Sequence, residues 1–165
     1  MSNLRESYRF GPLFECEYAE VVAMDSVAFG GSEIYVATLA EIIESPDAPS
    51  LQAVFAKKVV YRKTERIVAY ILIDLFATSV SILRIAVDPK HQRQGLGKKL
   101  VEYAKEFVSF RRPVLLAEVE DTQLAAHCLF RECGLICTEM LDDELNPGQH
   151  AYRFEYLHDW KESNA

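Results

Sequence analysis

The sequence predicts one α/β domain, a mixed sheet of seven strands with helices on both faces. The first observation is the order of strand-like and helix-like patterns, which is β-α-α-β-β-β-α-β-α-β-β. The second is length: 165 residues, 50% of them hydrophobic, suffice for one core and are too few for two ordinary domains. The third is the longest apolar run, residues 67–77, which Asp74 interrupts and which is too short to cross a bilayer. We therefore expect a single domain over residues 1–165.

The N-terminal third predicts an edge strand or extended arm, followed by two helices. Residues 1–14 carry irregularly spaced apolar side chains around Gly11-Pro12, which favours the strand or arm. Helically spaced apolar residues predict a helix from Tyr18 to Phe29. Glycines end this helix, and a serine caps a second one from about Glu33 to Glu44. A proline-rich turn, residues 45–50, follows.

Three strands follow in the middle of the chain. Leu51 to Val60 and Arg66 to Ala77 are joined by a polar turn, and the second, rich in isoleucine, valine and tyrosine, is typical of a central strand. In the third, Val80 to Val87, the apolar positions are even up to residue 82 and odd from residue 83 onward. A strand buried on both faces produces this pattern, and so does a bulge that moves the side chains to the other face. The sequence leaves both possibilities open.

The second half predicts a helix, a strand, a helix and two final strands. Their predicted bounds are Gly95 to Phe110, Pro113 to Glu120, Thr122 to Gly134, Leu135 to Leu141 and Ala151 to Leu157. The core-facing residues predicted for the first helix are Leu96, Leu100, Ala104, Phe107 and Val108. Those predicted for the second helix are Leu124, Ala125, Cys128, Leu129 and Cys133. An acidic loop, residues 142–149, joins the last two strands.

Charge and cysteine content limit the possible functions of the chain. The net charge is −7, from 18 basic and 25 acidic residues, which argues against a general nucleic-acid binder and is compatible with a cationic amine or a basic peptide terminus. The 4 cysteines form no C-x-x-C pair and accompany no histidine cluster, so we expect free thiols and no metal site. The N-terminal residues form no apolar signal segment. We expect a cytoplasmic protein with no membrane partner.

One stretch, residues 85–100, carries the strongest functional signal. It has the pattern of a buried strand, a turn and a helix start, with Gly95 and Gly97 at the junction. The unpaired N–H groups and the dipole at a helix start bind phosphate groups, and glycine lets a ligand approach the backbone closely. Arg93, Lys98 and Lys99 add positive charge around this turn. The pattern predicts a site for a phosphate or pyrophosphate.

Two common nucleotide-binding motifs are excluded. The G-x-G-x-x-G fingerprint needs a third glycine where Leu100 stands, and no acidic residue follows at the distance that a ribose contact requires. The P-loop needs a glycine five positions before Gly97 and a hydroxyl residue after Lys98, and both are missing. A turn whose glycines only relieve steric strain is the remaining alternative.

The pattern Val87-x-Pro89-x-x-Gln92-x-x-Gly95-x-Gly97 resembles the acetyl-CoA motif Q/R-x-x-G-x-G/A of the GNAT superfamily of N-acetyltransferases. The resemblance extends from about Glu17 to Tyr156 and is closest to bacterial enzymes that acetylate the N-terminal alanine of a ribosomal protein. It implies the GNAT fold: a mixed, mostly antiparallel seven-stranded sheet whose central strands are splayed by a bulge. It also implies acetyl-CoA as cosubstrate, with no metal.

The resemblance assigns residues to the cosubstrate. The backbone of Ile85, Ala86 and Val87 is expected to contact the pantetheine arm. The residues expected to hold the pyrophosphate are Gln92, Arg93, Gln94, Gly95, Leu96, Gly97 and Lys98. Gln123 stands where the family has an asparagine that binds the pantetheine, and it keeps an amide at a longer reach.

Glu118 is the candidate catalytic base. Strand alternation places it on the face of Val114 and Leu116. It also matches the glutamate that acts as base in the ribosomal N-terminal acetyltransferases. A base must reach the amine directly or through a water. An ordinary strand-end carboxylate exposed to solvent is the alternative.

The last helix departs from the family pattern at two positions besides Gln123. Phe130 stands for the tyrosine that protonates the leaving thiolate, and Leu135 stands for a phenylalanine. A phenyl ring has no proton to donate. Thiolate departure does not require an acid, since a thiol with a pKa near 8.5 is a tolerable leaving group. Tyr152 or Tyr156 is an alternative source of a hydroxyl.

The sequence thus predicts an acetyl-CoA-dependent N-acetyltransferase that acts by direct attack of a primary amine. The first candidate acceptor is a protein N-terminal α-amine. A small-molecule amine is the second possibility. A non-catalytic acyl-CoA-binding sensor is the third, because of Phe130. By resemblance, acceptor choice is expected to depend on Phe29 to Ser50 and the loop near Asp142. The expected protein is a monomer or homodimer.

Overall fold

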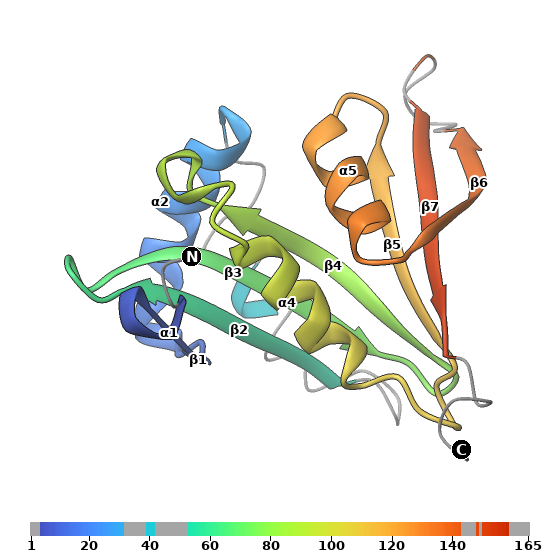
Figure 1. The fold of residues 1–165 in the computed structure, drawn as a ribbon, viewed down its shortest axis with the longest axis horizontal. Coiled ribbons are helices and arrows are strands. Elements are labelled where there is room, and N and C mark those ends of the chain that lie inside the picture. The colour runs from blue at the N-terminus through green and yellow to red at the C-terminus, as the bar shows by residue number, and fades with distance from the viewer. Residues whose placement is uncertain (1–3, 32–38, 42–52, 143–147, 149, 159–165) are drawn as a thin grey trace.

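The computed structural model describes residues 4–31, 39–41, 53–142, 148 and 150–158. One seven-stranded sheet has the order β1-β2-β3-β4-β5-β7-β6, and only β4 and β5 pair in parallel (Figure 1). The strands are β1 (Tyr8–Pro12), β2 (Ala53–Tyr61), β3 (Arg66–Leu75), β4 (Ser79–Val87), β5 (Val114–Glu120), β6 (Ile136–Asp142) and β7 (His150–Leu157). The helices are α1 (Leu4–Ser7), α2 (Tyr18–Phe29), α4 (Leu96–Lys105) and α5 (Leu124–Glu132), with short 3-10 turns η1 (Glu15–Glu17) and η2 (Pro89–His91).

The predicted mixed, mostly antiparallel sheet with helices on both faces is confirmed. Residues 39–41 are helical, but the rest of the helix predicted from Glu33 to Glu44 and the turn at 45–50 lie outside the described residues. Most of the predicted loop at 142–149 lies outside them as well. The larger differences from expectation are the short helix α1 before the edge strand β1 and the end of α4 at Lys105 rather than near Phe110.

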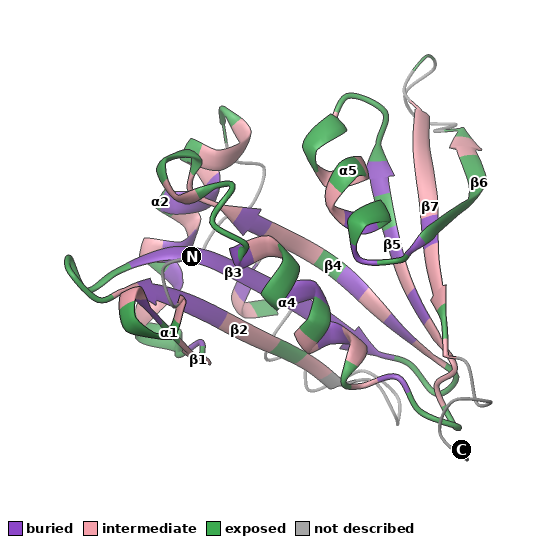
Figure 2. Ribbon diagram, viewed as in Figure 1, coloured by how far each residue is buried: buried purple, intermediate pink, exposed green. Residues whose placement is uncertain are grey.

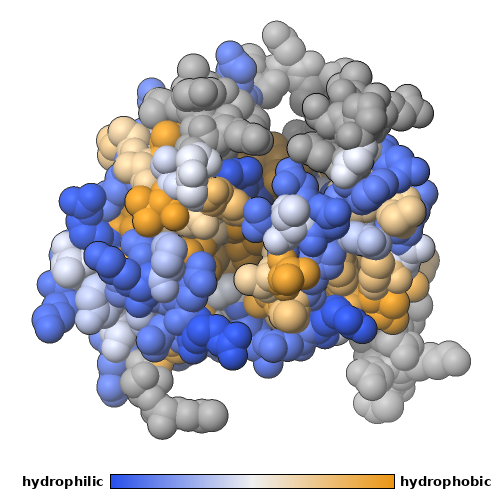
Figure 3. Space-filling model, turned by 90° about the horizontal axis from the view of Figure 1, so that it is seen from above, coloured by the Kyte–Doolittle hydropathy of each residue, from blue (hydrophilic) through white to orange (hydrophobic). Residues whose placement is uncertain are grey.

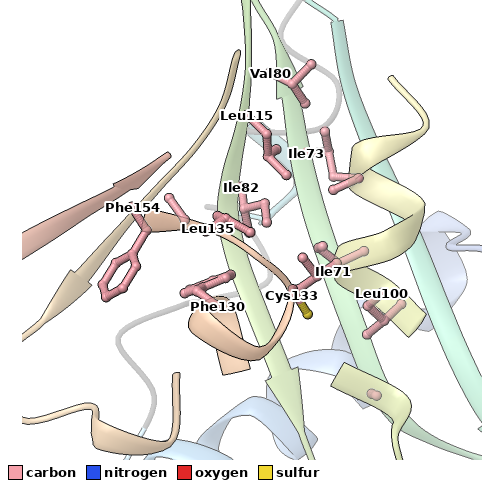
Figure 4. Close-up of a cluster of buried hydrophobic side chains, with 14 of the residues drawn as sticks. Ile71, Ile73, Val80, Ile82, Leu100, Leu115, Phe130, Cys133, Leu135 and Phe154 are labelled. Carbon is pink, nitrogen blue, oxygen red and sulfur yellow. The ribbon is translucent and has the colours of Figure 1, made fainter. Parts of the chain in front are cut away.

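The central strand β3 organises two cores, because nine of its ten residues are buried (Figure 2). On one face, α4 and α5 cover a cluster that continues across the sheet to β7 (Figures 1 and 4). On the other face, α2 packs over a smaller cluster that includes Val21, Met24 and Tyr70. Burial on both faces explains why the β3 sequence is almost continuously apolar.

The two core-facing helices differ in how well the sequence predicted them. In α4 the expected Leu96, Leu100 and Ala104 are all buried. The stripe predicted for α5 is only partly right: Leu129 and Cys133 face the core, but Leu124, Ala125 and Cys128 are exposed. The residues that face the core are Ala126, Leu129, Phe130 and Cys133. The observed stripe is rotated from the predicted one by about 100°, roughly one residue position on the helix, and the α5 sequence is apolar enough on both sides to permit either.

A bulge in β4 explains why its apolar positions change from even to odd residue numbers. The register with β3 shifts so that Leu72 lies opposite Arg84 and Ile73 opposite Ile82, which leaves Leu83 as the extra residue. Before the bulge, Val80 and Ile82 belong to the cluster under α4; after it, Ile85 and Val87 pack against that cluster. The predicted bulge is therefore present, and it turns Arg84 toward α2.

Beyond the bulge, β4 and β5 separate. Their parallel pairing covers only Ser79–Ile82 of β4 and Val114–Ala117 of β5. Past these residues β4 continues beside β3, while β5 continues beside β7, so the two halves of the sheet diverge in a V (Figure 1). We call the region between residues 83–87 and 118–120 the split.

Leu100→Ala tests the core under α4. Leu100 is fully buried, so we expect a loss of about 2–5 kcal/mol in the free energy of unfolding. Leu157→Ala removes the same atoms from a side chain that is 66% exposed, and a change below about 0.5 kcal/mol is expected. Urea unfolding measures both, and equal losses would contradict the assignment of Leu100 to the core.

Candidate active site

The first feature of the site is the edge of β4 that faces the split. The N–H of Asp88 donates to the carbonyl oxygen of Val68 on β3 at 2.8 Å. Hydrogen-bonded and non-bonded pairs alternate along an antiparallel ladder, and the register is unbroken back to the bulge, so Ala86 also bonds to β3. The backbone N–H and C=O groups of Ile85 and Val87 therefore point toward the split. Of the three predicted backbone contacts, Ile85 and Val87 can meet a ligand there.

Seen from the open end of the V, hydrophobic side chains lie in a hollow between the two halves, and hydrophilic ones surround it (Figure 3). An extended ligand with amide groups suits such a place, because it can hydrogen-bond to the strand edge and lie against apolar side chains.

The second feature is the turn between β4 and α4. The side-chain amide of Gln92 donates to the carbonyl oxygen of Val87 at 3.1 Å and so links the turn to the split. Arg93 and Gly95 have φ angles of 61° and 84°, in the left-handed region that disfavours side chains with a Cβ. The turn is tied to β1 as well, because the ring of His91 is hydrogen-bonded through Nδ1 to the hydroxyl of Tyr8 at 3.0 Å.

Helix α4 begins at this turn with donors available. Gly95 is its N-cap, and the N–H of Lys99 donates to the Gly95 carbonyl oxygen at 3.1 Å. The N–H groups of Leu96, Gly97 and Lys98 come before this first helical bond and therefore have no partner within the helix. The dipole of α4 adds partial positive charge at the same point, so the turn can hold an anion.

Close packing of α4 against α5 explains the second glycine. A Cβ at Gly97 would lie 3.1 Å from Cδ2 of Leu129 on α5.

Gln123 stands at the N-cap of α5, and its backbone carbonyl accepts the N–H of Ala126 at 3.0 Å. Its side chain makes no capping hydrogen bond, so its amide is not committed to the helix end.

Glu118 lies directly after the last residue of β5 that pairs with β4. It is on the face opposite the buried Ala117 and Val119, the face that α2 covers on the other half of the sheet. Nε and Nη2 of Arg153, opposite it on β7, donate to Glu118 Oε1 at 3.3 and 2.9 Å. Nη1 of the same arginine donates to Glu139 Oε2 at 2.7 Å. The Glu118 carboxylate is thus 56% exposed and held by an arginine, rather than set among apolar side chains.

Phe130 is buried in the core. It is 2% exposed, and its ring centroid lies 5.9 Å from that of Phe154 (Figure 4). Of the two alternative hydroxyl residues, Tyr156 lies opposite Leu115, in the part of β5 still paired with β4, and the ammonium of Lys105 covers its ring. Tyr152 lies opposite Val119, beyond the point of separation.

A buried polar network joins α2 to β4 beside the split. Asp25, fully buried on α2, accepts from the hydroxyl of Tyr70 at 2.6 Å. Nε and Nη2 of Arg84 donate to the two carboxylate oxygens of Asp25 at 2.8 and 2.7 Å. Burial, then the hydrogen bond to Asp25, raise the pKa of Tyr70 far above its usual value, and the hydrogen bond to Asp25 raises the pKa of Arg84. The phenol therefore stays protonated and the guanidinium charged.

Sequence reasoning missed Asp25, Arg84 and Arg153. A signal exists for the first two: Arg84 is a charged residue inside an apolar strand, and Asp25 lies next to the apolar stripe of its helix. A buried charge requires a partner of opposite sign. The pairing itself joins residues 59 positions apart, which no local pattern reveals.

Some functional groups have no role in this site. Among the described residues, no three metal-ligating side chains converge. All four cysteines are free, and burial raises the pKa of the Cys133 thiol. No helix in the described part of the chain is long and apolar enough to cross a membrane.

A sheet split beside a bulge, with a glycine turn and a helix start at the end of the split strand, is typical of acyltransferases of the GNAT class. The chain matches the acetyltransferase (GNAT) family over residues 32–135 and belongs to it. No curated protein matches the sequence significantly.

Several solved structures are similar to this chain in fold. The ribosomal-protein-S18-alanine N-acetyltransferase from Escherichia coli is 18% identical with a TM-score of 0.72, and the match covers 91% of this chain and 93% of that one. NAA60 from Arabidopsis thaliana in complex with acetyl-CoA is 12% identical with a TM-score of 0.75, over 92% and 98%. A chimera of the spermidine N-acetyltransferase SpeG from Vibrio cholerae and hSSAT is 14% identical with a TM-score of 0.69, over 92% and 95%.

Arg84→Met tests the buried network. It leaves the Asp25 carboxylate without its arginine, so we expect the free energy of unfolding to fall by about 3 kcal/mol or more. The double variant Arg84→Met/Asp25→Asn, which removes both charges, should lose less than this single variant. Urea unfolding of the three proteins checks the order. A single variant as stable as the wild type would contradict a stabilising role for the pair.

Proposed function

We propose that this protein transfers acetyl from acetyl-CoA to a primary amine by direct attack, and that its acceptor is a protein N-terminal α-amine. The observation that carries the proposal is the split in the sheet: the backbone edge of Ile85 and Val87 leads to the anion-binding turn at Gly95. The strand edge thus offers hydrogen bonds to an arm that carries amide groups, and the turn at its end offers N–H donors to a pyrophosphate.

The turn and the split supply the cosubstrate site. The N–H groups of Leu96, Gly97 and Lys98 bind the pyrophosphate, with Arg93 adding charge. Residues Gln92, Gln94 and Gly95 shape the turn, and Gln123 adds an amide from α5. Ile85 and Val87 bind the pantetheine arm through their backbone, whereas Ala86 bonds to β3.

The chemistry needs few side chains. Acetyl-CoA supplies the acetyl group as a thioester. Backbone N–H groups along the separated part of β4 donate to its carbonyl oxygen and stabilise the developing negative charge. Glu118 accepts a proton from the ammonium, directly or through a water. The amine nitrogen then forms a bond to the acetyl carbon as the C–S bond breaks and the thiolate leaves.

Release of the thiolate proceeds without Phe130, because a phenyl ring donates no proton. Tyr152 is the alternative proton donor, since it lies beyond the separation of β4 and β5. An uncatalysed protonation by solvent after release is equally compatible with the leaving ability of a thiolate.

The choice of a protein N-terminus rests on the resemblance of the motif region to the ribosomal N-terminal acetyltransferases. The similar folds include a protein that acetylates an alanine of a ribosomal protein and one that acts on spermidine. A small-molecule amine is therefore the alternative acceptor. A sensor that binds acyl-CoA without turnover is the other alternative, favoured by Phe130.

Glu118→Gln tests the base. The amide cannot accept the proton, so we expect kcat/KM to fall by about 10²–10⁴-fold with acetyl-CoA affinity unchanged. Glu120→Gln is the matched control, because Glu120 is an exposed glutamate on the same strand and face. CoA release with an alanine-initiated peptide measures the rate, and calorimetry measures the affinity. Full turnover by Glu118→Gln would eliminate Glu118 as the base.

Gly95→Ala tests the anion-binding turn. At a φ of 84° a Cβ costs about 1–2 kcal/mol, which shifts the N–H groups from their positions. We expect the Kd for acetyl-CoA to rise about tenfold. In Gly11→Ala a Cβ meets nothing within 4 Å, and no change in affinity is expected. Unchanged binding by Gly95→Ala would place the pyrophosphate elsewhere.

A further inference from the structure

Arg84 combines three properties that suit it to bind the acceptor. The bulge at Leu83 turns it to the face of the sheet that carries α2 and Glu118, rather than the face under α4. It follows closely on Ile82, the last residue of β4 that pairs with β5, whereas Glu118 follows the last such residue of β5. Two groups of opposite charge thus flank the apex of the split on one face.

The side chain of Arg84 is fixed in place. Its bidentate hydrogen bonds to the fully buried Asp25 use Nε and one N–H of Nη2. The ring of Phe29, at the end of α2, lies 4.3 Å from its Cζ. A guanidinium held by a planar pair and a stacked ring keeps its direction without a ligand, so a further hydrogen bond costs little conformational entropy.

The guanidinium also keeps unused donors. A guanidinium has five N–H groups, and Asp25 takes two of them. Apart from its interaction with the hydroxyl of Tyr70, the Arg84 guanidinium shows no further hydrogen bond to a described residue, and the Arg84 side chain is 26% exposed. Because the charge of Arg84 is already balanced by Asp25, its remaining N–H groups suit a neutral carbonyl oxygen better than a second carboxylate.

We propose that Arg84 donates through Nη1 to the carbonyl oxygen of the acceptor's first residue, so that the site selects an amine with a peptide carbonyl next to it. The inference rests on the proposed acetyl transfer to an α-amine and adds how that amine is recognised. Glu118 faces the amine, and Arg84 holds the carbonyl beside it. Alkylamines and polyamines carry no such oxygen and lose this contact.

The test compares two acceptors in one variant. An alanine-initiated tetrapeptide amide carries the carbonyl, and propylamine does not. Arg84→Lys keeps a positive charge for Asp25, but its single ammonium cannot hold both carboxylate oxygens and also reach a carbonyl. We expect the ratio of kcat/KM for peptide over propylamine to fall tenfold or more, as is typical when a hydrogen bond from a charged donor is lost. The ratio does not depend on the fraction of folded enzyme.

Arg66→Lys is the matched control. Arg66 is also an arginine paired with a carboxylate, that of Glu20 at 3.1 Å, but its side chain is 72% exposed at the start of β3. The ratio should equal that of the wild type in this variant. Free alanine, tested as a third acceptor, should be used less well than the peptide by the wild type.

Each outcome is decisive. If the peptide-over-propylamine ratio of kcat/KM is unchanged in Arg84→Lys, the recognition role of Arg84 is overturned. The proposed acetyl transfer is not affected by that result. A wild type that prefers propylamine to the peptide overturns it as well. Binding of acetyl-CoA with no turnover of any amine refutes the proposed transfer itself, and the recognition role falls with it.

Discussion

The end of hydrogen bonding between β4 and β5 is the constraint on which the site depends. A strand edge presents unpaired N–H and C=O groups, and such groups require partners when they are shielded from water. The parallel pairing stops after four residue pairs, and the backbone of Ile85 and Val87 is directed toward the split. A fold that leaves a central edge open in this way is stable only where solvent or a ligand satisfies that edge. The opening thus leaves backbone donors and acceptors that a ligand can satisfy.

Contacts on both faces of the sheet maintain this opening. On one face, α4 and α5 approach closely because Gly97 has no side chain, and their buried residues form one cluster with the sheet. On the other, hydrogen bonds between Asp25 and Arg84, just past the bulge, join α2 to the separated part of β4. The bulge supplies the link between these faces, because one extra residue reverses the direction of every side chain after it.

Local patterns predicted the parts of the fold that depend on local physics. Helix α2 and strand β3 have the expected starts because helical periodicity and a continuous apolar run are properties of a short segment. The parity change in β4 left a bulge as one of two possibilities, and the register with β3 places it at Leu83. The phase of α5 was not predictable, because its exposed Leu124 and Cys128 are as apolar as its buried residues. The pairs Asp25–Arg84 and Glu118–Arg153 join residues 59 and 35 positions apart, which only the assembled sheet brings together.

The surroundings of the candidate base and the pKa of the acceptor both bear on which amine the site can acetylate. Glu118 is half exposed and hydrogen-bonded to Arg153. An α-amine has a pKa near 8, so roughly one molecule in ten is neutral at pH 7; an alkylamine with a pKa near 10.4 is neutral in roughly one of a few thousand. The α-amine therefore needs less help from a base than the alkylamine does. This difference between the amines supports the proposed protein N-terminus over a polyamine as the acceptor.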